Sequence, residues 1–194
     1  MKTLILNGSP RPRGDTVSLI NVVSTLIDGE VRTVRAYDRG ISPCMDCRYC
    51  WEHDWCCIND AMNDVYHYIQ EADNIIIASP VYFSEVTGKM LDLASRLQMF
   101  YCLRHYRDIE LIPTPKRGAV ILVGGGDGTV QRAYDTSKIL LHQMNCHDIH
   151  PLVSSHNTNF ASAADDPAAL EGLMSIARFL NKEVKKPLAD KKVN

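Results

Sequence analysis

Short runs of apolar residues alternate along this chain with longer segments of helical period, and this alternation constrains the fold more than any other feature. Residues 74–78 (NIIIA) are typical of a strand buried on both faces, because the run is almost uninterrupted. The predicted strands are residues 4–6, 31–34, 74–78, 119–123 and 149–153, the first, third and fourth of them fully buried. The predicted helices are residues 16–27, 60–71, 88–101, 129–144 and 167–182. Five strand–helix units in this order predict an α/β fold, in which a parallel sheet with right-handed crossovers is covered by helices on both faces.

The composition indicates one globular domain. The chain has 194 residues, 45% hydrophobic and 23% charged, enough to bury a sizeable core without cross-links. We predict a single domain over residues 1–185, with a cysteine-rich insertion at 42–57 and a charged tail at 186–194. No apolar run approaches the ~20 residues that span a bilayer. A net charge of -2 gives no overall attraction to nucleic acid. The odd number of cysteines, seven, and a start without signal-peptide features predict a cytoplasmic protein without membrane or nucleic-acid partners.

The loop after the first predicted strand suits an anion. Ligands of such sheets bind beyond the carboxyl ends of the strands. Residues 7–16 (NGSPRPRGDT) offer a hydroxyl, two arginines and glycines directly before a helix, a composition suited to a phosphate. The loop matches neither the dinucleotide fingerprint nor the P-loop. The alternative is an ordinary turn in which Asp15 or Thr16 caps the helix.

The loops after the third and fourth strands suit a flat ligand. Residues 79–88 (SPVYFSEVTG) place Tyr82 and Phe83 at the sheet edge, where they could cover a planar ring or instead pack under the next helix. Residues 124–129 (GGGDGT) contain glycines that let a backbone approach a ligand closely. Thr129 stands where a dinucleotide fingerprint needs glycine or alanine, so that motif is only weakly matched.

Five of the seven cysteines lie in residues 42–57 (SPCMDCRYCWEHDWCC). The candidate metal ligands have the spacing C-x2-C-x2-C-x5-C and are Cys44, Cys47, Cys50 and Cys56. Two consecutive two-residue gaps are typical of a [4Fe–4S] ligand run, and Cys57 could replace Cys56 as the fourth ligand. A four-cysteine zinc site and free or regulatory thiols are the alternatives. Cys102 and Cys146, in helical segments, are expected to be buried and inert.

The three loops together resemble those of the NAD(P)H-dependent FMN reductases of the flavodoxin-like superfamily. The segments GSPRPRGDT, SPVYFSEVTGKMLDLASRL and GGGDG carry the resemblance, and the cysteine spacing is similar more narrowly to that of the iron-sulfur flavoproteins in this family. The resemblance covers nearly the whole chain. It implies a flavodoxin-like three-layer sandwich with a five-stranded parallel sheet of order 2-1-3-4-5.

The resemblance also implies which residues bind the cofactor. Those expected at the FMN phosphate are Ser9, Arg11, Arg13, Asp15, Thr16 and Ser18. Those expected at the flavin ring are Pro80, Val81, Tyr82, Phe83, Gly125, Gly126 and Asp127. The family usually has asparagine at the position of Asp15. Because a carboxylate repels a phosphate, we expect Asp15 to cap the helix while the arginines supply compensating charge.

We therefore expect an FMN-dependent NAD(P)H oxidoreductase, without a catalytic side chain of its own because the flavin carries the chemistry. With a [4Fe–4S] cluster it would pass single electrons onward, whereas without one it would reduce a free flavin, a quinone, or a nitro or azo compound. A flavodoxin-like electron carrier and a thiol or metal sensor are the other readings of the sequence. The electron acceptor is a small molecule or a protein. The resemblance implies a homodimer or homotetramer. Hydrolase motifs such as H-E-x-x-H and G-x-S-x-G do not occur in the sequence.

Overall fold

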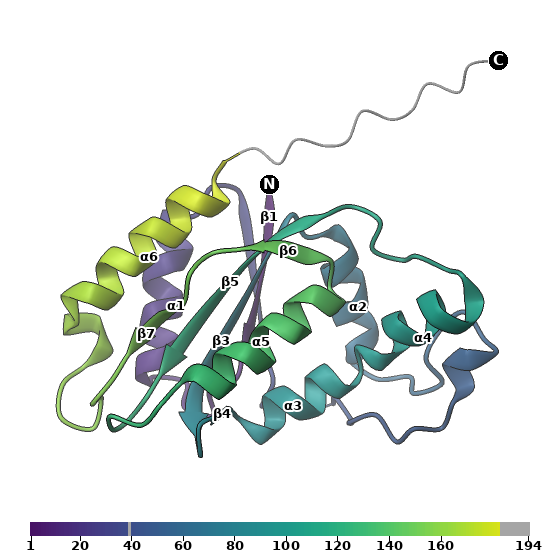
Figure 1. The fold of residues 1–194 in the computed structure, drawn as a ribbon, viewed down its shortest axis with the longest axis horizontal. Coiled ribbons are helices and arrows are strands. Elements are labelled where there is room, and N and C mark those ends of the chain that lie inside the picture. The colour runs from purple at the N-terminus through teal and green to yellow at the C-terminus, as the bar shows by residue number, and fades with distance from the viewer. Residues whose placement is uncertain (39, 183–194) are drawn as a thin grey trace.

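The computed structural model describes residues 1–38 and 40–182, so the predicted tail at 186–194 lies outside the described residues. The elements are β1 (Lys2–Asn7), α1 (Asp15–Leu26), β2 (Glu30–Arg35), η1 (Tyr49–Trp51), α2 (Met62–Glu71), β3 (Asn74–Tyr82), β4 (Glu85–Val86), α3 (Gly88–Ser95), α4 (Gln98–Arg107), β5 (Lys116–Val123), α5 (Gln131–Gln143), β6 (Cys146–Ile149), β7 (Val153–Ser155), η2 (Ala163–Asp165) and α6 (Pro167–Leu180). Figure 1 shows α1 and α6 on one side of the sheet, with α2, α3, α4 and α5 on the other. The predicted α/β fold with a covered parallel sheet is confirmed.

The strand count and numbering differ from the prediction. Within the described residues the sheet has seven strands in the order β2-β1-β3-β5-β6, with β4 antiparallel to β3 and β7 beside β5, so the expected five-stranded 2-1-3-4-5 sheet is wrong. One added strand arises because β3 continues past Pro80 into a hairpin, where Val81 faces Val86. The other arises because the expected last strand is interrupted between Ile149 and Val153, with both parts still paired to β5. Pro151 lies in this gap and cannot donate a ladder hydrogen bond.

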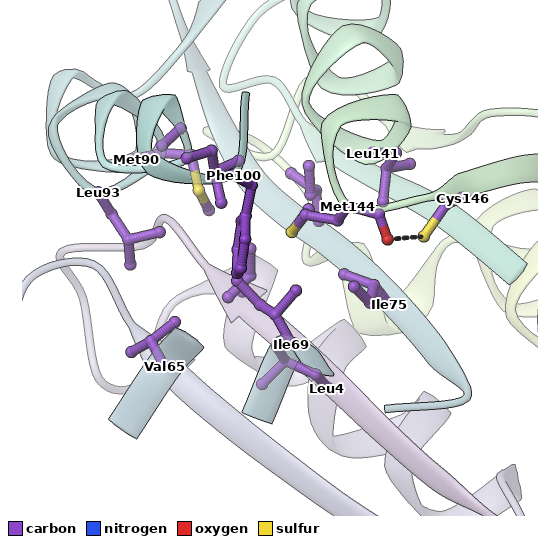
Figure 2. Packing of buried hydrophobic residues seen from close by; sticks show 14 of the residues in the cluster. Leu4, Val65, Ile69, Ile75, Met90, Leu93, Phe100, Leu141, Met144 and Cys146 are labelled. Atoms are coloured by element: carbon purple, nitrogen blue, oxygen red, sulfur yellow. Dashed lines mark hydrogen bonds between the residues drawn. The ribbon is translucent and has the colours of Figure 1, made fainter. Parts of the chain in front are cut away.

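Alternate residues of the central strands face opposite helical layers. In β1, Leu4 and Leu6 pack in the cluster formed with α2, α3, α4 and α5, whereas Ile5 packs in the cluster formed with α1 and α6. Figure 2 shows the first cluster, in which Phe100 of α4 lies near Ile69 of α2 and Leu4 of β1. The three strands expected to be fully buried are buried at residues 4–6, 74–78 and 119–123. This core fixes the sheet whose carboxyl edge carries the site.

The predicted helix 88–101 is two helices, α3 and α4, with a break at Arg96 and Leu97. At the break the backbone N–H groups of these two residues bond carbonyls three positions back, on Leu93 and Ala94. The tighter turn directs the buried Arg96 side chain toward residues 42–60, where its hydrogen-bond acceptors lie. The sequence analysis did not predict this break, because apolar residues continue through both helices.

None of the helices in the described ranges is long and apolar enough to cross a membrane.

Candidate functional site

The loops after β1, β3, β5 and β7 surround one open cleft of about 110 Å³, which we name the sheet-edge cleft. It is lined by Ser9, Pro10, Arg11, Gly14, Asp15, Thr16, Pro80, Val81, Tyr82, Val123, Gly125, Thr158 and Asn159. These strands are parallel neighbours, so their carboxyl ends meet at one edge and gather loops that are distant in the sequence.

The β1–α1 loop presents polar groups to this cleft. The Ser9 hydroxyl accepts a hydrogen bond from the Arg11 backbone N–H at 3.2 Å, which folds the loop into a tight turn. Gly14 caps α1 and provides no side-chain hydrogen bond to the first turn of the helix. The N–H groups at the start of α1 are therefore not satisfied by a cap, and Asp15 and Thr16 lie on the cleft wall. Such a helix start favours an anion.

The buried Thr87 joins the first two loops. Its hydroxyl donates to the Gly8 carbonyl at 2.8 Å and accepts from the Met90 N–H at 3.4 Å, so it also caps α3. Its own N–H donates to the Ser79 hydroxyl at 3.2 Å. A Cβ on Gly8 would lie 2.7 Å from that same hydroxyl oxygen, which explains why glycine is needed at this close approach. The two loops therefore form one hydrogen-bonded unit.

The β3–β4 hairpin exposes two aromatic side chains. Tyr82 is 45% exposed and Phe83 fully exposed, so the alternative in which both pack under the next helix is wrong. Phe83 and Ser84 form the two-residue turn, with φ of 53° and 63° in the left-handed region. This conformation is costly for a bulky residue. Glu85 holds the hairpin from the other side, because its carboxylate accepts a hydrogen bond from the Thr136 hydroxyl of α5 at 2.9 Å.

The glycine-rich loop after β5 packs against the segment after β7. The backbone N–H groups of Thr158 and Asn159 donate to the carbonyls of Gly124 and Gly125 at 3.2 and 3.1 Å. A Cβ on Gly125 would lie 2.8 Å from the Asn159 side-chain oxygen. The two segments therefore close one wall of the cleft, and Gly125 must lack a side chain for them to do so.

A second, much smaller cavity, of about 20 Å³, lies under the cysteine-rich loop (residues 42–57), and we name it the thiol cavity. Six cysteines line it: Cys44, Cys47, Cys50, Cys56, Cys57 and Cys102. Cys102 is buried in α4 as expected, and its place on the wall of this cavity was not predicted. Cys146 is buried as expected, although it begins β6 and is not in a helix. Trp51 stacks on Tyr106 of α4 at 4.3 Å and fastens the loop to that helix.

The thiols of this cavity differ in environment. Cys47 and Cys57 are exposed and their sulfurs are 3.3 Å apart. The Tyr49 backbone N–H and the Cys57 thiol lower the pKa of Cys47. Burial and the nearby Cys102 thiol raise the pKa of Cys50 to about 12. Within residues 1–38 and 40–182 no set of three or more His, Cys, Asp or Glu side chains already stands in a metal-ligating arrangement.

Residues 1–159 match the model of a protein family described as NADPH-dependent FMN reductase. The chain belongs to this family. The prediction of an NAD(P)H-dependent oxidoreductase of the FMN reductase type is thus confirmed, with FMN and NAD(P)H as its cofactors. The flavodoxin-like character of the α/β fold is confirmed as well.

The relatives lie in the predicted subgroup. The chain is 29% identical to an iron-sulfur flavoprotein of Methanocaldococcus jannaschii, over 95% of each chain. It is 27% identical to an iron-sulfur flavoprotein of Methanosarcina thermophila, over 87% of this chain and 84% of the relative. An FMN-dependent NADH-azoreductase from Bacillus anthracis, solved with FMN, has the same fold with a TM-score of 0.69 and 15% identity, over 94% of this chain and all of the other.

An FMN reductase needs a phosphate site beside a ring site, and the sheet-edge cleft fits both requirements. Of the predicted FMN residues, the structure brings together on its walls Ser9, Arg11, Asp15, Thr16, Pro80, Val81, Tyr82 and Gly125. The others do not line the cleft: Arg13, Ser18, Phe83, Gly126 and Asp127. Ser18 instead donates its hydroxyl to the Gly14 carbonyl within the helix.

The expectation that Asp15 caps α1 is wrong. Gly14 holds the cap position, and the Asp15 carboxylate accepts hydrogen bonds from the Ala163 N–H at 2.9 Å and the Ser162 hydroxyl at 3.3 Å. One carboxylate oxygen is therefore turned toward η2. These donors offset the negative charge that the sequence places beside the predicted phosphate site.

Five cleft residues were not predicted from the sequence: Pro10, Gly14, Val123, Thr158 and Asn159. For Thr158 and Asn159 a signal existed, because a polar segment follows the last strand at the same carboxyl edge.

Proposed function

We propose that this protein is an FMN-dependent NAD(P)H oxidoreductase that passes electrons singly through a [4Fe–4S] cluster in the cysteine-rich loop. The observation that carries the proposal is the gathering of four thiols with ferredoxin-like spacing around one cavity: Cys44, Cys47, Cys50 and Cys56. The names of the relatives, which are iron-sulfur flavoproteins, support it.

We propose that the sheet-edge cleft divides the work of FMN binding. Ser9, Thr16 and the N–H groups at the start of α1 bind the phosphate, and Arg11 adds positive charge. Pro80, Val81 and Tyr82 lie along the ring, and Gly125 allows close backbone approach. We propose that the other predicted residues border the cofactor from outside the cleft walls: Arg13, Ser18, Phe83, Gly126 and Asp127. FMN, when bound, accepts a hydride from NAD(P)H and can release electrons singly or in pairs.

In the thiol cavity the chain supplies thiolate ligands, and binding of metal must remove their protons. Cys47 has a lowered pKa and therefore ionises more readily than an ordinary thiol. Cys50, whose pKa is raised to about 12, needs the metal to draw off its proton. The close pairs, Cys47 with Cys57 and Cys50 with Cys102, must separate as the ligands turn toward the metal.

The two sites lie at opposite ends of one helix. Thr87, at the start of α3, joins the loops of the sheet-edge cleft. At the other end the Ser95 hydroxyl accepts a hydrogen bond from the Cys44 N–H at 2.9 Å. With eight residues, α3 is about 12 Å long at about 1.5 Å per residue. We propose that this rigid element fixes the separation of the two redox sites within one chain.

Counting electrons tests the proposal. The anaerobically purified protein, reduced stepwise while the flavin absorbance is recorded, is expected to take up about three electron equivalents per chain, two for FMN and one for the cluster. About two equivalents would contradict the cluster and favour a cluster-free reductase of flavins, quinones, or nitro or azo compounds. We further propose a homodimer or homotetramer, to be measured by light scattering.

A further inference from the structure

Arg96, at the break between α3 and α4, contacts the cysteine-rich loop more extensively than a surface arginine would. We propose that Arg96 is a positioning residue that closes this loop and presents Cys56, not Cys57, as the fourth ligand. The inference rests on the proposed function for the cluster itself, but its structural part concerns only residues of this chain.

The guanidinium of Arg96 is almost completely enclosed, with 1% of the residue exposed. Its Nη1 donates to the Asp60 carboxylate at 2.8 Å and to the Ser42 carbonyl at 2.9 Å. Its Nη2 donates to the Ile58 carbonyl at 3.2 Å, and its Nε to the Tyr66 hydroxyl at 3.3 Å. The planar fork thus uses all three nitrogens, which a lysine could not reproduce.

These contacts close the loop at both ends. Ser42 is its first residue, Ile58 follows directly after its last residue, and Asp60 lies two residues further on. Asp60 strengthens the closure, because its carboxylate also accepts the N–H groups of Ser42 at 2.9 Å and Met62 at 3.0 Å. A buried charge pair of this kind is costly to break from one side, since the remaining charge loses its partner. The thiols are therefore carried on a segment whose two ends are held together.

The same guanidinium distinguishes the two adjacent cysteines. Nη2 lies 3.4 Å from the Cys56 sulfur, with geometry for donating a hydrogen bond. Cys56 is half-buried, whereas Cys57 is exposed and its sulfur lies 3.3 Å from that of Cys47. This hydrogen bond holds the Cys56 sulfur in place beside the guanidinium. Two thiolates in contact repel each other, so Cys47 and Cys57 are poorly placed to ligate together.

The first experiment measures cysteine alkylation in the FMN-loaded, iron-free full chain. Under anaerobic conditions, limiting iodoacetamide and tandem mass spectrometry give a rate for each cysteine. We expect Cys57 to react faster than Cys56 in the parent protein, and Arg96→Gln to raise the Cys56 rate about tenfold. The matched control is Arg107→Gln, which removes an arginine of α4 that also reaches the loop, at the Glu52 carbonyl and Asp54, without contacting a thiol. It should leave the ratio of the two rates unchanged.

The second experiment measures iron per chain and the reduction potential in the reconstituted protein. Cys56→Ser is expected to lose the iron and Cys57→Ser to keep it. Arg96→Lys is expected to keep the iron but to lower the midpoint potential, because a hydrogen bond to a ligand sulfur is lost. An unchanged potential, or loss of iron only in Cys57→Ser, would overturn the inference.

The outcomes separate this inference from the proposed function. If the parent protein binds no iron, the cluster is disproved, while the alkylation rates still test the closure of the loop by Arg96. Equal Cys56 and Cys57 rates in the parent protein, or no effect of Arg96→Gln, would contradict the closure. If Arg96→Gln does not fold, Arg96→Lys is used for the same rates, with a smaller rise at Cys56 expected.

Discussion

Thr87 holds the loops of the sheet-edge cleft together, and replacing it with valine tests that role. Valine keeps the shape of the side chain but removes the hydroxyl that donates to the Gly8 carbonyl and caps α3. Loss of the cap costs about 0.5–2 kcal/mol. Leaving the buried Gly8 carbonyl without its donor costs about 1–3 kcal/mol. We therefore expect Thr87→Val to lower the free energy of unfolding by about 2–4 kcal/mol.

Thr87→Ser is the matched control, because it keeps the hydroxyl and loses one methyl group, worth about 0.8 kcal/mol. Urea denaturation of the FMN-free protein measures both costs, and quenching of FMN fluorescence measures the affinity. Thr87→Val should raise the FMN dissociation constant by about tenfold, which corresponds to about 1.4 kcal/mol. The reasoning would be refuted if valine cost no more than serine, or if valine destabilised the protein without weakening FMN binding.

Three further predictions follow from the same loops and from one helix cap. Gly125→Ala should weaken FMN binding about tenfold because its Cβ meets Asn159, whereas Gly128→Ala, which meets nothing within 4 Å, should stay within about twofold by the same fluorescence assay. Phe83→Asn should raise the free energy of unfolding of the FMN-free protein, measured by urea denaturation, by about 1 kcal/mol, because asparagine tolerates the left-handed turn. The same variant should weaken FMN binding. Ser84→Asn should raise the free energy of unfolding without changing FMN binding. The Ser155 hydroxyl and the first N–H groups of α6 lower the pKa of Asp166, so its stabilising effect is present above about pH 4 and is lost as the pH falls through the native value. The asparagine of Asp166→Asn does not titrate, so the free energy of unfolding of this variant should approach that of the parent protein as the pH falls. Urea denaturation at about one-unit steps from pH 6 to pH 2 measures both free energies. A difference between them that stays constant over this range would contradict the prediction.

Sequence patterns predicted the layers of the fold because the central strands are buried on both faces. The apolar runs that contain Leu4, Ile76 and Ile121 leave no other arrangement than a sheet between two helical layers. The hairpin of β3 and β4 was missed because its turn is Phe83-Ser84, which lacks the glycine or asparagine that such turns usually have. The break in the last strand coincides with Pro151, a signal that the sequence analysis did not use, whereas the break at Arg96 depends on tertiary contacts, which periodicity does not report.

The site was predicted where one loop supplies several polar groups and missed where distant segments meet. The resemblance led to Ser9, Arg11 and Tyr82, all of which line the cleft. Asn159 was missed because its place depends on pairing with the glycine-rich loop. Cys102 was missed for a related reason, because only the packing of α4 under the cysteine-rich loop brings its thiol to the others.

Iron analysis tests the central claim most directly. The protein is purified anaerobically, and iron and acid-labile sulfide per chain are measured together with the visible spectrum. We predict about four irons and about four sulfides per chain, with flavin bands above a broad absorbance from the cluster. A flavin spectrum without iron or sulfide would contradict the account, and the thiols of the cysteine-rich loop would then serve a cluster-free FMN reductase.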